Sequence, residues 1–589
     1  MLRADTATSR LRAIALACAC ALALPAMAQS VRTLQGAALR SERGADAAQL
    51  ATLDAGREVD LLQLSGGWAQ VQAQTPSGAQ RGWLRASLLD LNAPLVAQVS
   101  QLETGRRAQG NMAVTLGVRS LPPRNNRHAL IVGVGSTAAD AARPVEPLAG
   151  VLHDMRGALA MAQALQVPAD NITLLRDAAA TRAGVLAATR ELDARVRAGD
   201  RVFIYWSGHG SRRFDAAEGG CVETLVPYDL QAIDNGELAQ WIKPLGDKAD
   251  KLLVFVDAGH VGGAAARSTP SATRSGDGGF TSKFIPLDSA CRQPDKLRTR
   301  GLGAALGGLG LSANDFVHLA SSRPDEPSWD NPARGGLATE SLRQCLQGEA
   351  RDSDGSGSIS IDEVAACAQA KIDALLALAT RYGASHLTLS GNRGFVPAWF
   401  ADAGASAAIT AAAPPRAGAS AALALDGVLE QIHAQRDTKR SVVVTPTKDA
   451  LRIGVDSLEF SVQSSHSGHV YVALLGSDRE SLVLLFPNAL DVRNRIGAGE
   501  TLVLPRAAWR IKPDGPPGRN TVLVLVADGP RDLSLLGADK AGPFTKPLID
   551  AQGRSRLQWL LGTNAAAQGG CSSGCSDAFG SALVGIEER

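Results

Sequence analysis

Residues 251–260 read KLLVFVDAGH, an apolar run that ends at an aspartate and a short turn. The apolar residues do not alternate with polar ones, which indicates a strand buried on both faces, as in a parallel sheet. Three further stretches share this character, namely HALIVGVG from residue 128, RVFIYWSGHG from residue 201 and DFVHLASS from residue 315. Helical patterns over 148–165 and 181–199 separate the first two of these. Strands that alternate with helices predict an α/β sandwich with a mostly parallel sheet.

Two turns at predicted strand ends are candidates for chemistry, because sites in open α/β sheets form where the carboxyl ends of strands meet. The stretch SGHG places His209 after one strand, between Gly208 and Gly210. These glycines let the backbone turn sharply and should leave the imidazole exposed. The turn that follows Asp257 places Gly259 at the end of another strand. We therefore expect His209 and Gly259 at the same edge of the sheet.

Six short motifs follow one another between residues 127 and 400. In chain order they are LAGVLHDM, LLRDAAAT, GDRVFIYWSGHG, ETLVPYD, LLVFVDAGH and LASSRPDEPS. This order resembles the caspase family, on its bacterial, metacaspase-like branch. The resemblance implies that His209 is the general base and that a nucleophilic cysteine should stand where this chain has Gly259. It also implies a specificity pocket for Arg or Lys, whose matching positions here are Asp154, Ser207 and Asp257.

The chain departs from that family at the nucleophile. A cysteine peptidase needs a thiolate, activated by an imidazole, to form its acyl intermediate. Gly259 supplies neither a thiol nor a hydroxyl, and loss of such a nucleophile removes on the order of 10⁶ in kcat. We therefore expect a catalytically inactive member of the cysteine endopeptidase family that regulates or binds peptides.

Two alternatives stay open at this point. An active cysteine-type endopeptidase with Arg or Lys preference would use Cys221 or Cys291 as its thiol, together with His209. Cys221 follows His209 in the next loop, and Cys291 lies in the segment after the Gly259 turn. The other alternative is a non-enzymatic envelope scaffold, which would not bind basic peptides.

Residues 352–363, DSDGSGSISIDE, have the full spacing of an EF-hand calcium loop. Loop positions 1, 3, 5, 7, 9 and 12 fall on Asp352, Asp354, Ser356, Ser358, Ser360 and Glu363. Position 6 is a glycine, as the sharp turn requires, and all the donors are oxygen atoms, which Ca²⁺ prefers. We expect Ca²⁺ to bind with a dissociation constant of about 10⁻⁴–10⁻³ M, the range of extracellular modules.

The first 28 residues have the pattern of a secretory signal peptide, with cleavage after about Ala28. A periplasmic or secreted protein meets an oxidising compartment, so we expect disulfides. Six cysteines remain in the mature chain, and six allow 15 pairings, between which the sequence does not choose. Proximity along the chain suggests Cys345 with Cys367 and Cys571 with Cys575, which leaves Cys221 with Cys291.

The rest of the chain divides into further predicted domains. Residues 29–92 resemble a bacterial Src-homology-3-like barrel, in which Trp68 and Trp83 line a groove or fill the core. A connector covers 93–126, and the caspase-like domain with its EF-hand loop covers 127–400. An Ala/Pro/Gly linker follows at 401–428, then an all-β sandwich at 429–540, which resembles a bacterial domain of unknown function. We expect an irregular tail over 541–589.

Composition narrows the class of partner. The chain has 60 Lys and Arg residues against 58 Asp and Glu residues, so we expect no nucleic-acid partner. No apolar run in the mature chain approaches the ~20 residues that span a bilayer, so we expect no transmembrane segment. The remaining candidates are a basic peptide or protein segment in the acidic pocket and a cell-envelope component on the N-terminal barrel.

Overall fold

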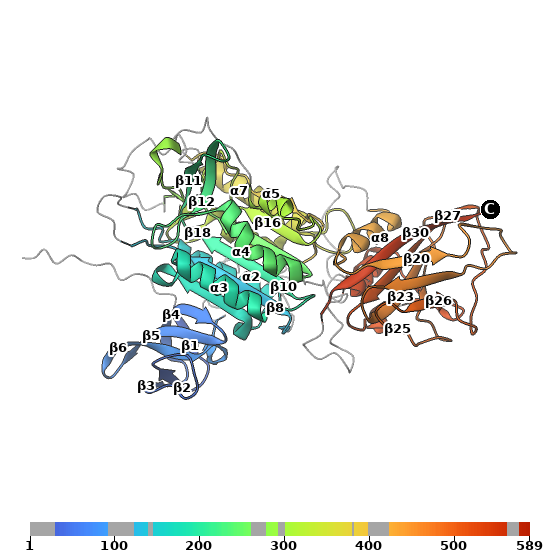
Figure 1. Ribbon diagram of the computed structural model, residues 1–589, viewed down its shortest axis with the longest axis horizontal. Coiled ribbons are helices and arrows are strands. Elements are labelled where there is room, and N and C mark those ends of the chain that lie inside the picture. The colour runs from blue at the N-terminus through green and yellow to red at the C-terminus, as the bar shows by residue number, and fades with distance from the viewer. Residues whose placement is uncertain are drawn as a thin grey trace, which may run out of the picture.

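The computed structural model shows three parts in chain order: a small N-terminal barrel, a central sheet with helices on both faces, and a C-terminal β-rich part (Figure 1). It describes residues 30–91, 123–138, 145–260, 279–291, 301–379, 382–397, 423–536, 538–561 and 576–589. The predicted signal peptide and the predicted Cys571–Cys575 pair lie outside the described residues. Within the described residues no helix combines the length and the apolar content needed to cross a bilayer.

The central sheet contains the four strands that the sequence predicts. Its strands run in the order β19-β16-β14-β10-β8-β9, and only β19 is antiparallel to its neighbour. The strands are β8 (Arg127–Gly133), β9 (Ile172–Arg176), β10 (Arg201–Ser207), β14 (Lys251–Asp257), β16 (Phe316–Ala320) and β19 (Thr388–Gly391). The prediction of a mostly parallel α/β sheet is confirmed.

Helices cover both faces of this sheet, which explains why apolar residues fill the middle of its strands without alternation. Tyr205 and Phe255 pack with α2 (Val151–Ala164), α6 (Leu337–Gln344) and α7 (Ile361–Leu378). Their neighbours Ile204 and Val254 pack on the other face with α3 (Arg182–Arg195), α4 (Asn235–Lys248) and α5 (Leu302–Gly308). Both faces are therefore dry, and successive side chains of one strand enter different cores.

The N-terminal barrel continues the central sheet. Its strands are β1 (Ser30–Thr33), β2 (Ala37–Arg40), β3 (Gln49–Leu53), β4 (Glu58–Ser65), β5 (Trp68–Thr75), β6 (Gly78–Arg85) and β7 (Leu89–Asp90). Strand β4 pairs antiparallel with β9 through Gln63 and Leu64. Trp68 is buried with the Arg85 guanidinium 4.3 Å from its ring centroid. Trp83 is half-buried with Arg43 over its ring.

The C-terminal part has two sheets that face each other across a shared apolar core. One contains β20 (Val442–Pro446), β22 (Phe460–Ser464) and β26 (Thr501–Leu504). The other contains β21 (Ala450–Leu451), β23 (Gly468–Leu475), β24 (Leu482–Phe486), β25 (Arg495–Ile496), β27 (Gly518–Ala527), β28 (Ala538–Ala541), β29 (Phe544–Pro547) and β30 (Phe579–Glu588). Helices α8 (Leu425–Ala434) and α9 (Ala551–Leu557) complete this part.

The prediction of an irregular tail over 541–589 is wrong. Strand β30 pairs with β27 over ten residue positions and is a central strand of the larger sheet. Its sequence, FGSALVGIEE, looks loop-like because of its small residues. Gly580 is needed because a Cβ there would lie 2.4 Å from the carbonyl oxygen of Arg440, so a close backbone approach selects glycine within a strand.

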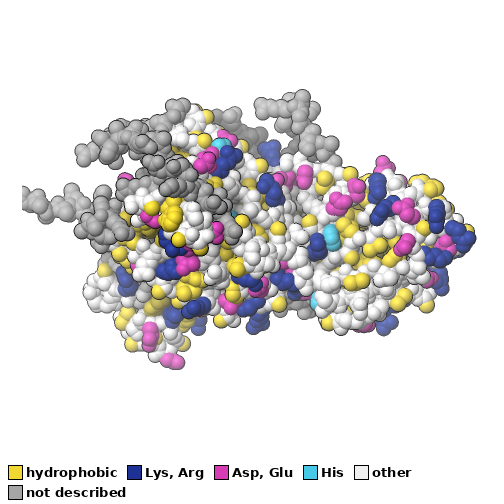
Figure 2. Space-filling model, turned by 45° about the horizontal axis from the view of Figure 1, so that its top comes forward, with side chains coloured by type: hydrophobic (Ala, Val, Ile, Leu, Met, Phe, Trp, Pro, Cys, Tyr) yellow, Lys and Arg dark blue, Asp and Glu magenta, His cyan; other side chains and the backbone are white. Residues whose placement is uncertain are grey.

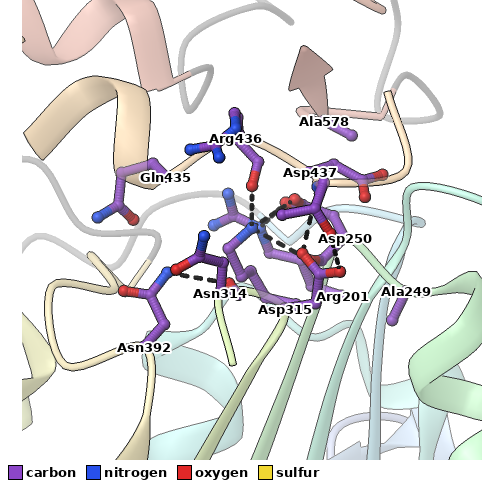
Figure 3. Close-up of polar contacts among 12 residues, drawn as sticks. Arg201, Ala249, Asp250, Asn314, Asp315, Asn392, Gln435, Arg436, Asp437 and Ala578 are labelled. Atoms are coloured by element: carbon purple, nitrogen blue, oxygen red, sulfur yellow. Dashed lines mark hydrogen bonds and ion pairs between the residues drawn. The ribbon is translucent and has the colours of Figure 1, made fainter. Parts of the chain in front are cut away.

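Cations begin three neighbouring strands of the central sheet, and the C-terminal part covers them. Arg127, Arg201 and Lys251 stand side by side at the amino ends of β8, β10 and β14. Asp250 accepts hydrogen bonds from Arg201 (2.8 Å) and Lys251 (2.9 Å), and Lys251 also donates to the carbonyl of Arg436 (Figure 3). This polar contact joins the two parts of the chain.

Charges on the face of the molecule drawn in Figure 2 are mixed in sign. Figure 2 shows Lys and Arg side chains interspersed with Asp and Glu over the face in view. That distribution agrees with the near balance of acidic and basic residues in the sequence.

Candidate active site

His209 lies in the turn between β10 and β11 (Gly210–Asp215), as expected. Its Nε2 lies 2.8 Å from the carbonyl oxygen of Glu146. A carbonyl can only accept, so Nε2 carries the hydrogen and Nδ1 is left as the basic nitrogen. Nδ1 is buried and has no hydrogen-bond partner among the described residues. Burial lowers the pKa of His209 to about 4, which keeps the ring neutral.

The prediction of an exposed imidazole is wrong, because His209 is only 2% exposed. A segment from later in the chain lies across the turn. The amide N–H of Gly210 donates to the carbonyl of Lys283 (2.8 Å), and Ile285 donates back to the carbonyl of Gly210 (3.0 Å). Residues 280–285, named here the self-segment, therefore cover the strand end.

Gly259 follows β14 and lies against the His209 turn. A Cβ on Gly210 would lie 2.1 Å from the carbonyl oxygen of Gly259, so the two turns touch. A Cβ on Gly259 itself would lie 3.2 Å from the amide nitrogen of Ser328 and 3.4 Å from the carbonyl carbon of Lys283. The structure thus brings together the expected base and the position of the missing nucleophile, with a peptide carbonyl beside them.

The three predicted pocket residues converge, and they converge on Lys283. The Lys283 ammonium donates to Asp154 (2.6 Å) and to the Ser207 hydroxyl (3.0 Å), and it lies 3.0 Å from Asp257. The Ser207 hydroxyl in turn donates to Asp154 (2.7 Å). Lys283 is fully buried. The acidic pocket, which we expected to be open to a peptide from outside, is filled by a lysine of the same chain.

Further groups support the two carboxylates of the acidic pocket. Asp257 accepts from the Ser328 hydroxyl (2.9 Å) and the Thr339 hydroxyl (2.5 Å), while Asp154 accepts from the Gly336 amide (2.5 Å). Burial raises the pKa of Asp154 to about 7 against the opposing charge of Lys283. Burial alone would lower the pKa of Lys283, but the surrounding carboxylates raise it, so the ammonium stays charged.

The backbone of Lys283 is held as firmly as its side chain. Its carbonyl oxygen accepts from the amides of Gly210 (2.8 Å) and Gly259 (3.1 Å), and its own amide donates to the carbonyl of Ser328 (2.9 Å). Two convergent backbone N–H groups on one carbonyl oxygen form the arrangement that stabilises a tetrahedral oxyanion in acyl transfer. The site therefore combines a neutral imidazole, two convergent amides and an acidic pocket, and residue 259 has no side-chain heavy atom.

Sequence reasoning missed Lys283, Ser328 and Thr339. The available signal for Lys283 was a cation inside the stretch FTSKFIP, soon after the Gly259 turn. The stretch gives no helical or strand period that would have fixed its place, and its partner β17 (Trp329–Asn331) is only three residues long. Only the fold brings it to the pocket.

Disulfides rule out the alternative of a relocated thiol. Cys221 pairs with Cys291, and Cys345 pairs with Cys367, so both of these predicted pairs are confirmed. Neither Cys221 nor Cys291 carries a free thiol, and the interpretation of an active peptidase that uses one of them with His209 is wrong.

The predicted calcium loop brings its three carboxylates together. Ligand oxygens of Asp352, Asp354 and Glu363 lie within 4.8 Å of one another. Burial, together with the neighbouring Asp354 and Glu363, raises the pKa of Asp352 to about 6. Ser360 acts as the N-cap of α7 and exchanges hydrogen bonds with Glu363, while Ser356 bonds to Ser358. A set of hard oxygen donors that repel one another fits a divalent cation such as Ca²⁺.

Comparisons with known proteins agree with this architecture. Family models match a caspase domain at residues 126–374, a bacterial SH3 domain at 35–90 and a domain of unknown function, DUF4384, at 450–530. No curated protein matches the chain significantly.

Two solved structures are similar to part of the chain. Protein GSU0716 from Geobacter sulfurreducens has 18% identity and a TM-score of 0.31, with 45% of this chain and 92% of that chain covered. Caspase-1 from Spodoptera frugiperda has 14% identity and a TM-score of 0.30, with 48% of this chain and 93% of that chain covered.

Proposed function

We propose that this protein, whose central domain is caspase-like, is a catalytically inactive member of the cysteine endopeptidase family that holds a basic peptide segment without cutting it. The observation that carries the proposal is the position of Gly259, which lies beside the Lys283 carbonyl and against the His209 turn and carries no nucleophilic atom. The retained groups bind, and none of them can form an acyl intermediate.

Each retained group has a role in holding a peptide. Asp154 and Asp257 bind the ammonium of a lysine, and the amides of Gly210 and Gly259 bind the carbonyl of the same residue. His209 keeps a neutral ring whose Nδ1 has no proton to accept from a side chain at 259. Recognition of a basic residue is therefore separated from its hydrolysis.

Three further features belong to the same proposal. Ca²⁺ would be held by Asp352, Asp354 and Glu363, with the carbonyl of Ser358 as an additional oxygen, and would order the start of α7. The signal-peptide pattern of residues 1–28 and the two disulfides favour an exported protein. The N-terminal barrel would attach the chain to a component of the cell envelope.

The test measures turnover of fluorogenic peptides that end in Arg or Lys, by the purified wild-type chain with and without Ca²⁺. We expect no turnover above the matched variant His209→Ala, because loss of the nucleophile removes about 10⁶ in rate. Turnover by the wild type that His209→Ala abolishes, or an acyl adduct trapped on the wild-type chain, would overturn the proposed function.

A further inference from the structure

We propose that Ca²⁺ in the loop of residues 352–363 controls how firmly the C-terminal part docks on the caspase-like domain. The loop and helix α9 form one calcium-dependent contact between two parts of the same chain. This inference rests on the calcium binding in the proposed function, and it adds what the ion does there.

Three consecutive backbone carbonyls of the loop accept hydrogen bonds from the C-terminal part. They lie at loop positions 3, 4 and 5, which are Asp354, Gly355 and Ser356, and are named here the docking carbonyls. In that order they accept from the Leu423 amide (2.6 Å), the Arg554 guanidinium (3.3 Å) and the Gln558 side-chain amide (3.3 Å). An EF-hand loop offers its ion the carbonyl at position 7, which leaves the docking carbonyls to protein partners.

Helix α9 packs directly on the backbone of the loop. A Cβ on Gly357, at loop position 6, would lie 2.5 Å from the carbonyl carbon of Arg554. This glycine therefore permits the close approach of α9 as well as the sharp turn, in which its φ is 87°. Helix α9 is itself anchored, because Leu557 is buried in the apolar core of the C-terminal part with Val428 of α8. The loop thus contacts an element that belongs to that core.

The ion acts on the docking carbonyls through the residues that carry them. Asp354 and Ser356 offer side-chain oxygens at loop positions 3 and 5, and their own carbonyls meet the C-terminal part. An ion that holds these side chains also fixes the backbone of the same residues. Ligand oxygens of Asp352, Asp354 and Glu363 lie within 4.8 Å of one another, so without a cation their repulsion favours a loop that opens away from α9.

A disulfide directs the effect of the ion toward α9. In calcium sensors the ion changes the angle between the two helices that flank its loop. Here Cys345, which directly follows α6, is bonded to Cys367 in α7, so the helices on the two sides of the loop are tied together. The response to the ion is therefore concentrated in the loop backbone, where the docking carbonyls lie.

A buried acceptor at this contact points to a further polar partner. Gln558 is buried, and its Oε1 has no hydrogen-bond partner among the described residues. Its Nε2 donates to the Ser356 carbonyl, so the unpaired oxygen of the same amide lies next to the loop. Buried acceptors of this kind are normally satisfied by ordered water or an ion. The C-terminal part therefore has an oxygen to offer to the hydration shell of a cation in the loop.

Coupling between ion binding and docking is reciprocal. If Ca²⁺ strengthens docking by some factor, docking strengthens Ca²⁺ binding by the same factor. Arg554 donates to the carbonyls of Gly355 and Leu423 and is thus part of the contact. Loss of its guanidinium should therefore weaken Ca²⁺ binding even though every carboxylate of the loop is still present.

Hydrogen exchange of the full wild-type chain, titrated with Ca²⁺, tests the coupling. We expect peptides that contain Gly357, in the loop, and Leu423, in the C-terminal part, to exchange about ten-fold more slowly at 10 mM Ca²⁺ for a dissociation constant near 1 mM, because opening then requires release of the ion. Both peptides should respond with the same midpoint. Glu363→Gln should remove both responses.

A matched pair of variants on α9 tests the reciprocal effect. Arg554→Met removes the guanidinium from the contact, and we expect it to raise the Ca²⁺ midpoint of the loop peptide at least about five-fold, the low end of coupling between two sites. Arg556→Met changes the same helix at a side chain that makes none of these hydrogen bonds, so it should leave the midpoint unchanged.

The outcomes separate this inference from the proposed function. If Ca²⁺ slows exchange in the loop but leaves the Leu423 and α9 peptides unchanged, or if Arg554→Met keeps the wild-type midpoint, the inference is overturned and calcium binding stands. If Ca²⁺ leaves the loop peptide unchanged, both calcium binding and the inference are overturned. The absence of peptide hydrolysis is tested separately, by reporter turnover.

Discussion

The two ends of the central sheet both bury charges, and they use them differently. At the carboxyl end, Asp154 and Asp257 surround Lys283, and two amides grip its carbonyl. At the amino end, Arg127 pairs with Asp577, and Lys251 donates to Asp250 and to the carbonyl of Arg436. At the carboxyl end two backbone N–H groups converge on the Lys283 carbonyl, and the neutral imidazole of His209 lies in the adjoining turn.

This difference shows what buried charge can and cannot indicate. Burial lowers the pKa of Arg127 to about 9 although Asp577 opposes the shift, and burial lowers the pKa of His209 to about 4. Both groups are strongly perturbed, yet Arg127 joins two domains and faces no peptide bond. A perturbed pKa marks a candidate site, and the arrangement of donors around a carbonyl decides between a structural and a chemical role.

The largest expected effect comes from removing the cation at the carboxyl end. Lys283→Met keeps the length of the side chain but leaves Asp154 and Asp257 buried without a counter-charge. We expect a loss of about 3–5 kcal/mol in the free energy of unfolding, the usual cost of breaking a buried ion pair. Urea unfolding followed by tryptophan fluorescence measures it. A loss below about 1 kcal/mol would mean that the pocket opens to water and does not depend on Lys283.

The pH dependence of stability sharpens the same point. The pKa of Asp154 is raised from its ordinary value of 3.8 to about 7 in the folded chain. Between these values the folded chain holds a proton that the unfolded chain has lost, so this group makes stability fall as pH rises from about 4 to about 7. Asp154→Asn should remove that fall, which we expect at about 1 kcal/mol per pH unit.

The measurement compares urea midpoints of the wild type and Asp154→Asn at several pH values. His209, whose lowered pKa makes stability rise with pH in the same range, is present in both proteins and cancels from the difference. A difference between the two proteins that does not change with pH would mean that Asp154 keeps its ordinary pKa and that the pocket is wetter than its burial indicates. A wild type that gains stability relative to the variant as pH rises would mean that Lys283 lowers the pKa of Asp154.

At the amino end we expect a smaller loss. Asp577 accepts a hydrogen bond from the buried Arg127 guanidinium and forms an ion pair with the buried Arg124 guanidinium (2.7 Å). Asp577→Asn keeps the shape and one acceptor oxygen, so about 2 kcal/mol should be lost, the range of a hydrogen bond to a charged group. The exposed pair of Lys243 and Asp247 provides the control, because Asp247→Asn should change nothing measurable. Equal losses of unfolding free energy from Lys283→Met and Asp577→Asn would show that the two ends of the sheet do not differ in this respect.

The parts of the fold that the sequence predicts are those with a strong period. The runs that became β8, β10, β14 and β16 are mostly apolar and do not alternate, because both faces of the sheet are covered, and that pattern needs no knowledge of tertiary structure. Strand β30 escaped prediction because glycines at 580 and 585, chosen for close packing against neighbouring groups, resemble a loop. Close packing between distant segments leaves no local pattern.

The candidate site also has residues that could be predicted from the sequence and residues that could not. His209, Asp154, Ser207 and Asp257 were predicted because each lies in a motif with a recognisable neighbourhood. Lys283 lies in a short extended segment whose place is fixed by partners distant in the sequence, such as Ser207 and Asp154, which are 76 and 129 residues away. The sequence alone showed that residue 259 has no nucleophilic side chain, but it did not show that Lys283 fills the acidic pocket.

The calcium loop is a third cluster of charged groups, and it lies outside both ends of the central sheet. Within the described residues no Lys or Arg forms an ion pair with Asp352, Asp354 or Glu363, so nothing in that part of the chain does for them what Lys283 does for the acidic pocket. Because a cation must come from solvent, we expect 10 mM Ca²⁺ to stabilise the wild type by about 1.4 kcal/mol for a dissociation constant near 1 mM.

Differential scanning calorimetry with and without Ca²⁺ measures the shift. Glu363→Gln should lose it, and Glu349→Gln, a change outside the loop, should keep it. If Ca²⁺ still stabilises Glu363→Gln, the ion binds elsewhere. If Ca²⁺ does not stabilise the wild type, the loop relieves the repulsion between its carboxylates by protonation of Asp352.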